Sequence, residues 1–157
     1  MNDRNDQAPT AGDSLARCNA TLAWYLGQLD EDERIALASE PGPWGWTNHG
    51  DCSAFGREID GEPATTIAVI YTLDAVVRHS DRHAETAEHI AHHDPARVLR
   101  EIAARRRRLK RHHPRLAHDT DWIPCAECGR FAWPCPDLRD DLSAYADRPG
   151  YREEWRP

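Results

Sequence analysis

Three cysteines within eleven residues constrain this chain more than any other feature of its sequence. Cys125 and Cys128 are separated by two residues, and Cys135 follows after a loop of six. A C-x-x-C turn places two sulfurs on one side of a tight loop, and Gly129 permits the positive φ that such a loop needs. The spacing therefore predicts a metal-binding knuckle, and the expected ion is one structural zinc.

A tetrahedral zinc site needs a fourth ligand, and no further cysteine lies nearby. His118, seven positions before Cys125, is the expected fourth ligand. The alternatives that stay open are His112, His113 and the distant Cys52. Four protein ligands leave no position for a reacting water, so the expected zinc is structural. Bound zinc contributes about 10–16 kcal/mol to a small zinc-finger peptide, which suffices to order a proline-rich tail.

The other cysteines and the first residues of the chain indicate the cellular compartment. The chain has five cysteines, and its first dozen residues are polar, without the apolar core of a signal peptide. An odd count without a secretion signal argues against a disulfide framework. No apolar run approaches the roughly 20 residues of a membrane span. We therefore expect a soluble, cytoplasmic protein with no membrane partner.

The pattern of apolar residues predicts an α+β fold. Apolar residues at helical spacing from Leu15 to Leu29 predict an N-terminal helix, which the acidic segment 30–33 either interrupts or closes with a turn. Prolines on both sides of Gly42 end helical structure. Residues 44–47, 53–59 and 65–71 predict an antiparallel sheet of three to four strands, with 73–78 as a fourth strand or the approach to a helix.

Two consecutive helices are expected after the sheet. The first covers residues 83–93, and the second begins at Pro95 with Asp94 as its N-cap and stops before Pro114. Beyond residue 115 the chain is expected to be irregular apart from the zinc knuckle. The predicted parts are a disordered leader (1–12), an α+β domain (13–115) and a zinc-knuckle tail packed on that domain (116–157).

The second of these helices is strongly basic. From Arg97 to Arg115 the chain carries nine basic residues and one acidic residue, although its net charge is −7. Such a helix could bind phosphates, through the candidates Arg105, Arg106, Arg107, Arg108, Lys110 and Arg111. Alternatively, the cations complement the helix dipole or pair with acidic segments elsewhere in the chain. No aromatic residues are interleaved with them, so nucleic-acid binding is the alternative function.

No motif in the sequence argues for an enzyme. His89 and His93 are four residues apart, which allows metal chelation as in zinc hydrolases, but the glutamate of the H-E-x-x-H motif is missing. There is no Walker loop, G-x-S-x-G elbow or G-x-G-x-x-G loop. The leading hypothesis is therefore a non-enzymatic interaction protein with a structural zinc site.

Several segments together resemble one family of small proteins. They read PGPWGW at 41–46, EHIAHHDPARVLREIAARRR at 88–107, WPCPDLR at 133–139 and YADRPGYREEWRP at 145–157. They are similar to the domain of unknown function 6221 of high-GC actinobacteria and their phages. Members often end in YADHPDYREEW, whereas Arg148 and Gly150 stand here, which argues against chemistry in the tail. The resemblance implies a cytoplasmic protein of actinobacterial or phage origin. The leading hypothesis, drawn from the absent catalytic motifs and the closed zinc set, is an accessory protein of a phage or mobile element that binds a host protein.

Overall fold

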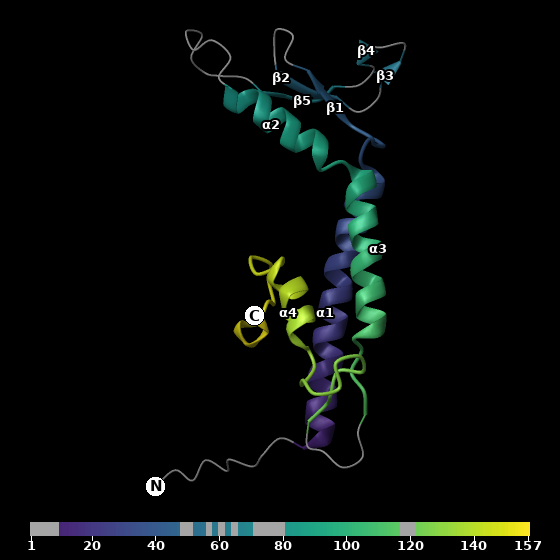
Figure 1. Ribbon diagram of the computed structural model, residues 1–157, viewed down its shortest axis with the longest axis vertical. Helices are drawn as coiled ribbons and strands as arrows, with labels where there is room; N and C mark the ends of the chain where they lie inside the picture. Colours follow the sequence, from purple (N-terminus) through teal and green to yellow (C-terminus); the bar gives the residue numbers. More distant parts are fainter. Residues whose placement is uncertain are drawn as a thin grey trace. The chain divides into compact units, whose positions relative to one another are not determined.

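The computed structural model describes residues 10–47, 52–55, 58–59, 62–63, 66–70, 81–116 and 122–157. Within these residues it has four α-helices, five short strands and one 3-10 turn (Figure 1). The helices are α1 (Ala11–Ala38), α2 (Asp81–His92), α3 (Pro95–Arg111) and α4 (Pro136–Ser143). The strands are β1 (Gly45–Thr47), β2 (Cys52–Phe55), β3 (Glu58–Ile59), β4 (Glu62–Pro63) and β5 (Thr66–Ile70), and the 3-10 turn is η1 (Glu153–Trp155).

The first helix, α1, is longer than the sequence predicts. It begins with a capping box, in which the Thr10 hydroxyl accepts a hydrogen bond from the Asp13 amide (3.2 Å) and the Asp13 carboxylate accepts one from the Thr10 amide (3.0 Å). The acidic segment continues the helix, because glutamate is a good helix former and Glu31 pairs with Arg34 one turn later (2.7 Å). The helix ends at Ala38, just before the predicted proline stop.

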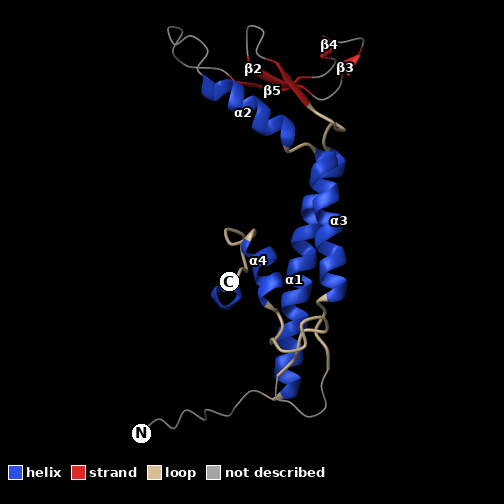
Figure 2. Cartoon of the chain, viewed as in Figure 1, coloured by secondary structure: helices blue, strands red, loops and turns tan. Residues whose placement is uncertain are grey.

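The chain forms two compact units. The first, here called the terminal unit, combines residues 1–30 with residues 104–157, and the second, the central unit, spans residues 31–103. Both boundaries fall inside helices, one in α1 and the other in α3. All the described strands, drawn in red in Figure 2, belong to the central unit.

In the central unit, a small sheet is covered by one helix. β1 pairs antiparallel with β2, and β2 with β5, while β3 and β4 form a separate pair. Helix α2 packs against all three strands of the larger sheet (Figure 1). Asp94 caps α3 as predicted, since its carboxylate accepts a hydrogen bond from the Arg97 amide (2.6 Å). A Cβ at Gly42 would lie 2.8 Å from that carboxylate, so this position requires a glycine.

In the terminal unit, the core joins α1 and α4 to the C-terminal segment. Leu29, Leu138 and Leu142 are at most 1% exposed. The C-terminal segment adds Trp155, which is 2% exposed and whose ring centroid lies 4.8 Å from that of Trp24 on α1. The C-terminal segment is therefore part of this core.

The predicted fold class, α+β built on an antiparallel sheet of three to four strands, is wrong, because short strands pair but helices make up most of the structure. The described residues are mostly helical, because α1 has 28 residues and α3 has 17, whereas the longest strand has five. The acidic segment continues α1, and the tail, expected to be irregular, contains α4. The possible fourth strand at 73–78 lies outside the described residues. No described helix combines the length and the apolar character of a membrane span.

Candidate metal centre

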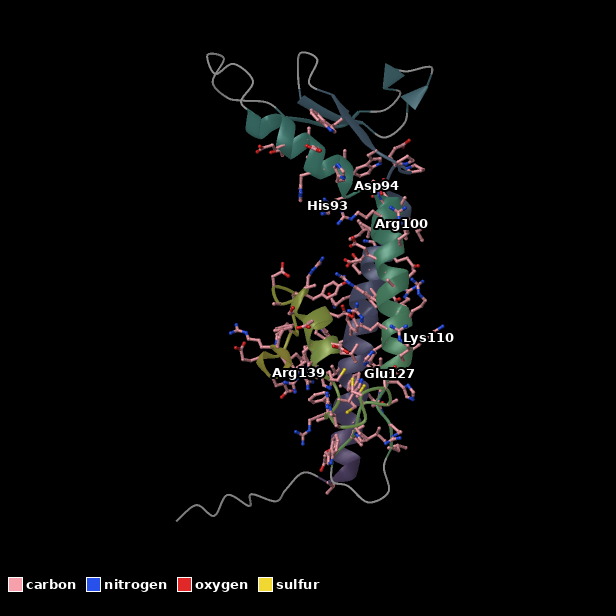
Figure 3. All side chains as sticks on the ribbon, viewed as in Figure 1. His93, Asp94, Arg100, Lys110, Glu127 and Arg139 are labelled. Carbon is pink, nitrogen blue, oxygen red and sulfur yellow. The ribbon has the colours of Figure 1, made fainter. Side chains whose placement is uncertain are left out.

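Three sulfurs and one imidazole come together in the terminal unit. They belong to Cys125, Cys128, Cys135 and His112, and their donor atoms all lie within 4.8 Å of one another. The Nδ1 atom of His112 lies 3.5 Å from each of the three sulfurs. Figure 3 shows sulfur atoms, in yellow, gathered beside the labelled Glu127. Among the described residues, this is the only such group of three or more histidine, cysteine or acidic side chains.

The three equal distances match a coordination tetrahedron. With zinc–sulfur bonds of about 2.3 Å and zinc–nitrogen bonds of about 2.0–2.1 Å, the edge between nitrogen and sulfur is about 3.5–3.6 Å. A hydrogen bond is directional, so it would bring a ring nitrogen close to one sulfur and not equally close to three. The four side chains could therefore hold one metal ion, and they would occupy all four tetrahedral positions.

Local structure places each of these side chains. His112 directly follows α3, and its amide still bonds to a carbonyl of the last helical turn (2.9 Å). Cys125 and Cys128 lie in a turn closed by the bond from the Gly129 amide to the Cys125 carbonyl (2.8 Å). Gly129 has a φ of 65°, the positive value that the sequence pattern predicts. Cys135 is the N-cap residue of α4.

One neighbouring side chain faces the imidazole of His112, and another fixes its backbone. Its Nε2 atom faces the Asp137 carboxylate at 3.8 Å, which favours the tautomer with the proton on Nε2 and leaves Nδ1 free to bind a metal. The indole N–H of Trp133 donates a hydrogen bond of 2.6 Å to the His112 carbonyl. A partner on the second ring nitrogen, here Asp137, holds a metal-binding imidazole in one orientation.

Two of the three thiols of the cluster lie in a poorly solvated environment, and the third is half-buried. Cys125 and Cys135 are fully buried. Burial raises the pKa of Cys135 to about 12, against the opposing effect of the Leu138 amide. Burial also raises the pKa of Cys128, and its neighbour Cys125 adds to the shift. The Cys128 and Cys135 thiols therefore keep their protons at neutral pH until a cation replaces them, so metal binding here would release protons.

The structure brings together the three predicted cysteines and identifies their histidine partner. His118, the expected fourth ligand, lies outside the described residues. The imidazole among the sulfurs is that of His112, one of the alternatives. His113 is exposed, and its Nδ1 atom instead faces a carbonyl of α3 at 3.1 Å. Cys52 belongs to the central unit.

The six basic residues considered for nucleic-acid binding divide into two sets. Three make contacts inside the terminal unit: Arg105 with the Tyr145 hydroxyl (3.0 Å), Arg106 with Asp30 (2.7 Å) and Arg108 with Asp141 (2.5 Å). The other three are exposed, and their spacing places them on one face of α3: Arg107, Lys110 and Arg111. Lys110 points away from its helix in Figure 3.

The two histidines considered for a hydrolase lie side by side on α2 and its C-terminal end. The ring centroids of His89 and His93 are 4.2 Å apart, and the Nδ1 atom of His93 lies 2.8 Å from the His89 carbonyl. That nitrogen is therefore the donor of a hydrogen bond and is not available to a metal. Within the part of the chain that the structure describes, no third ligand joins the pair.

The comparisons with known proteins give one match. No curated protein and no solved structure matches the chain. The sequence model of one family matches residues 19–157, a stretch that contains all four residues of the metal-binding cluster. Because this match covers far more than half of the sequence, the chain belongs to the family of unknown function DUF6221.

Proposed function

We propose that this chain is a non-enzymatic interaction protein whose terminal unit is held together by one structural zinc ion. The observation that carries the proposal is the closed set of His112, Cys125, Cys128 and Cys135, with three nitrogen–sulfur distances of 3.5 Å. Thiolates and imidazole select zinc over magnesium and calcium, which prefer oxygen. Four protein ligands leave no coordination position for a reacting water, so the ion would stabilise and not catalyse.

Exposed apolar side chains in the segments around the zinc ligands support an interaction role. Leu116, Trp122 and Phe131 are 65%, 39% and 38% exposed, and all three belong to the segments around the cluster. Aromatic side chains are enriched at the centre of protein interfaces, and exposed apolar groups often mark them. We propose that the partner is a protein. More specifically, we propose that a phage or mobile element encodes this chain and that the partner is a protein of its host.

The metal is tested by its stoichiometry in purified full-length protein. One zinc per chain is expected under reducing conditions, and Cys128→Ser should lower the content to near zero. Cys18→Ser is the matched control, because Cys18 is a buried thiol of the same unit outside the cluster. A metal-free wild-type protein would refute the zinc proposal.

The identity of the fourth ligand is tested with cobalt(II) in place of zinc. Thiolate-to-cobalt charge transfer and tetrahedral ligand-field bands are expected for the wild type. His112→Ala should change these bands, whereas His113→Ala should leave them unchanged, since His113 does not face the sulfurs. If the two variants give the same spectrum as the wild type, His112 is not a ligand.

The interaction role is tested with a surface variant that retains zinc. Proteins captured from the native host by the wild type are compared with those captured by the double variant Leu116→Ser and Phe131→Ser, at equal zinc content. A specific partner that is lost with the double variant supports the role. Identical sets of captured proteins would contradict a role of these two side chains in binding a partner.

A second candidate function is nucleic-acid binding, favoured by the three exposed cations Arg107, Lys110 and Arg111 on one face of α3. Each phosphate contact adds about −0.9 to the slope of log affinity against log salt concentration. Replacing all three by glutamine should therefore reduce the slope by up to about 2.7. Arg100→Gln, an exposed arginine of α3 in the central unit, is the control. An unchanged slope in the triple variant would exclude this face.

A further inference from the structure

The terminal unit contains a second feature that the zinc site does not explain. A cavity of about 300 Å³ lies between the start of α1, the loop before α4 and the C-terminal segment. Its walls include three indole rings, those of Trp122, Trp133 and Trp155. This volume is at the lower end of the range for small-molecule sites, and mostly apolar walls with a few polar groups are typical of such sites.

The charged groups of the cavity are mainly positive. Arg17 of α1 and Arg139 of α4 both line it, and within the described residues neither forms an ion pair. The Nε–H of Arg139 donates a hydrogen bond to the Pro134 carbonyl (3.1 Å), which holds the guanidinium at the wall with its terminal nitrogens available. The acidic side chain of the lining, Glu154, faces a different cation, Arg152, at 3.5 Å.

We propose that this cavity binds an aromatic carboxylate. Its ring would lie against the indoles, where aromatic pairs gain energy beyond their area of contact. Its carboxylate would pair with Arg139, because the planar guanidinium binds carboxylates through two parallel hydrogen bonds. A neutral ligand would leave a half-buried cation uncompensated, and a cationic ligand would be repelled by two guanidiniums.

The cavity is coupled to the metal-binding cluster. Trp133, one of its walls, donates its indole hydrogen bond to the carbonyl of His112, and Ile123 and Ala132 lie beside the loop that carries the cysteines. This inference rests on the proposed function in one respect: bound zinc would fix the loop that carries Trp133, which is one wall of the cavity. Zinc content is therefore measured before each titration, so that loss of metal and absence of ligand binding are told apart.

The test is calorimetric titration of the zinc-loaded full chain with two matched probes, 2-naphthoate and the neutral 2-naphthylmethanol. The naphthoate should bind about tenfold more tightly, the contribution of a charge-assisted hydrogen bond. Arg139→Gln should weaken naphthoate binding about tenfold and should not weaken binding of the alcohol. Ser14→Trp, whose added side chain would fill part of the cavity, should weaken both probes. The control is Arg107→Gln, an exposed arginine that does not line the cavity.

Two results would overturn the proposal. One is the absence of saturable binding of naphthoate to the zinc-loaded wild type. The other is equal naphthoate binding by Arg139→Gln and Arg107→Gln. A phenylalanine-ended peptide then distinguishes the source of the carboxylate: binding that requires a free carboxyl end assigns the site to a protein C-terminus, and no binding assigns it to a small aromatic acid.

Discussion

Replacing Gly150 with alanine should destabilise the terminal unit more than the same change at Gly129. Both glycines have positive φ, 85° and 65°, where alanine costs about 1–2 kcal/mol. The two sites differ in their surroundings. A Cβ at Gly150 would lie 2.8 Å from Nε1 of Trp24, whereas a Cβ at Gly129 would meet nothing within 4 Å.

The difference follows from what Trp24 would lose by moving. Its indole N–H donates a 3.0 Å hydrogen bond to the Pro149 carbonyl, which contributes about 0.5–1.5 kcal/mol. Its ring packs on that of Trp155 with centroids 4.8 Å apart, a further contribution of about 0.5–1.5 kcal/mol. Gly150→Ala should therefore cost about 2–5 kcal/mol, against about 1–2 kcal/mol for Gly129→Ala.

The free energy of unfolding is measured by urea denaturation of zinc-loaded protein, followed by tryptophan fluorescence. Gly27→Ala serves as a third variant, because Gly27 lies inside α1 with nothing within 4 Å of a Cβ. That change should stabilise the protein by about 1 kcal/mol. If Gly150→Ala lowers the free energy of unfolding no more than Gly129→Ala does, Gly150 does not pack closely against Trp24 and the reasoning is refuted.

Three further changes test other parts of the fold. Thr10→Ala should cost about 1 kcal/mol in urea unfolding, because it removes the capping box with Asp13 at the start of α1. Trp155→Ala should cost about 3–5 kcal/mol, since the ring is 2% exposed. Burial raises the pKa of Asp141 and outweighs the opposing effect of Arg108, so this carboxyl favours the fold when protonated. The stability of the wild type relative to Asp141→Asn should therefore fall as pH rises above about 4, measured by urea unfolding across pH; a flat or rising difference would contradict it.

The three sulfur ligands could be predicted from the sequence, but the sequence could not decide which histidine completes the cluster. Helical spacing from Ile102 and Leu109, both buried, favours position 113 over 112 on the inner face. The helix ends at Arg111, however, so its spacing no longer applies at the residues that follow. The direction of those side chains depends on hydrogen bonds to the cysteine loop, which no local pattern contains.

Long-range packing explains most of the errors in the predicted fold. The tail was expected to be irregular because it is rich in proline, yet it contains α4 and buries Trp155. Its partner Trp24 lies 125 positions before Pro149, the residue whose carbonyl it bonds. The predicted break in α1 was wrong because of a local interaction, not a long-range one. The acidic segment supplies helix-stabilising pairs such as Glu31 with Arg34. The caps at Asp94 and Pro95 were predictable because they depend on neighbouring residues alone.

Two of the four residues of the metal-binding cluster lie at helix ends, and the helix dipoles act on them. His112 adjoins the carboxyl end of α3, which carries partial negative charge, and Cys135 caps the amino end of α4, which carries partial positive charge. Both helix dipoles would favour an ion bound between these residues. The cation would lie near the carboxyl end of α3, and the Cys135 thiolate would lie at the amino end of α4. A bound ion would then hold the end of α3 and the start of α4 together, two helix ends that residues 112–135 separate in the sequence.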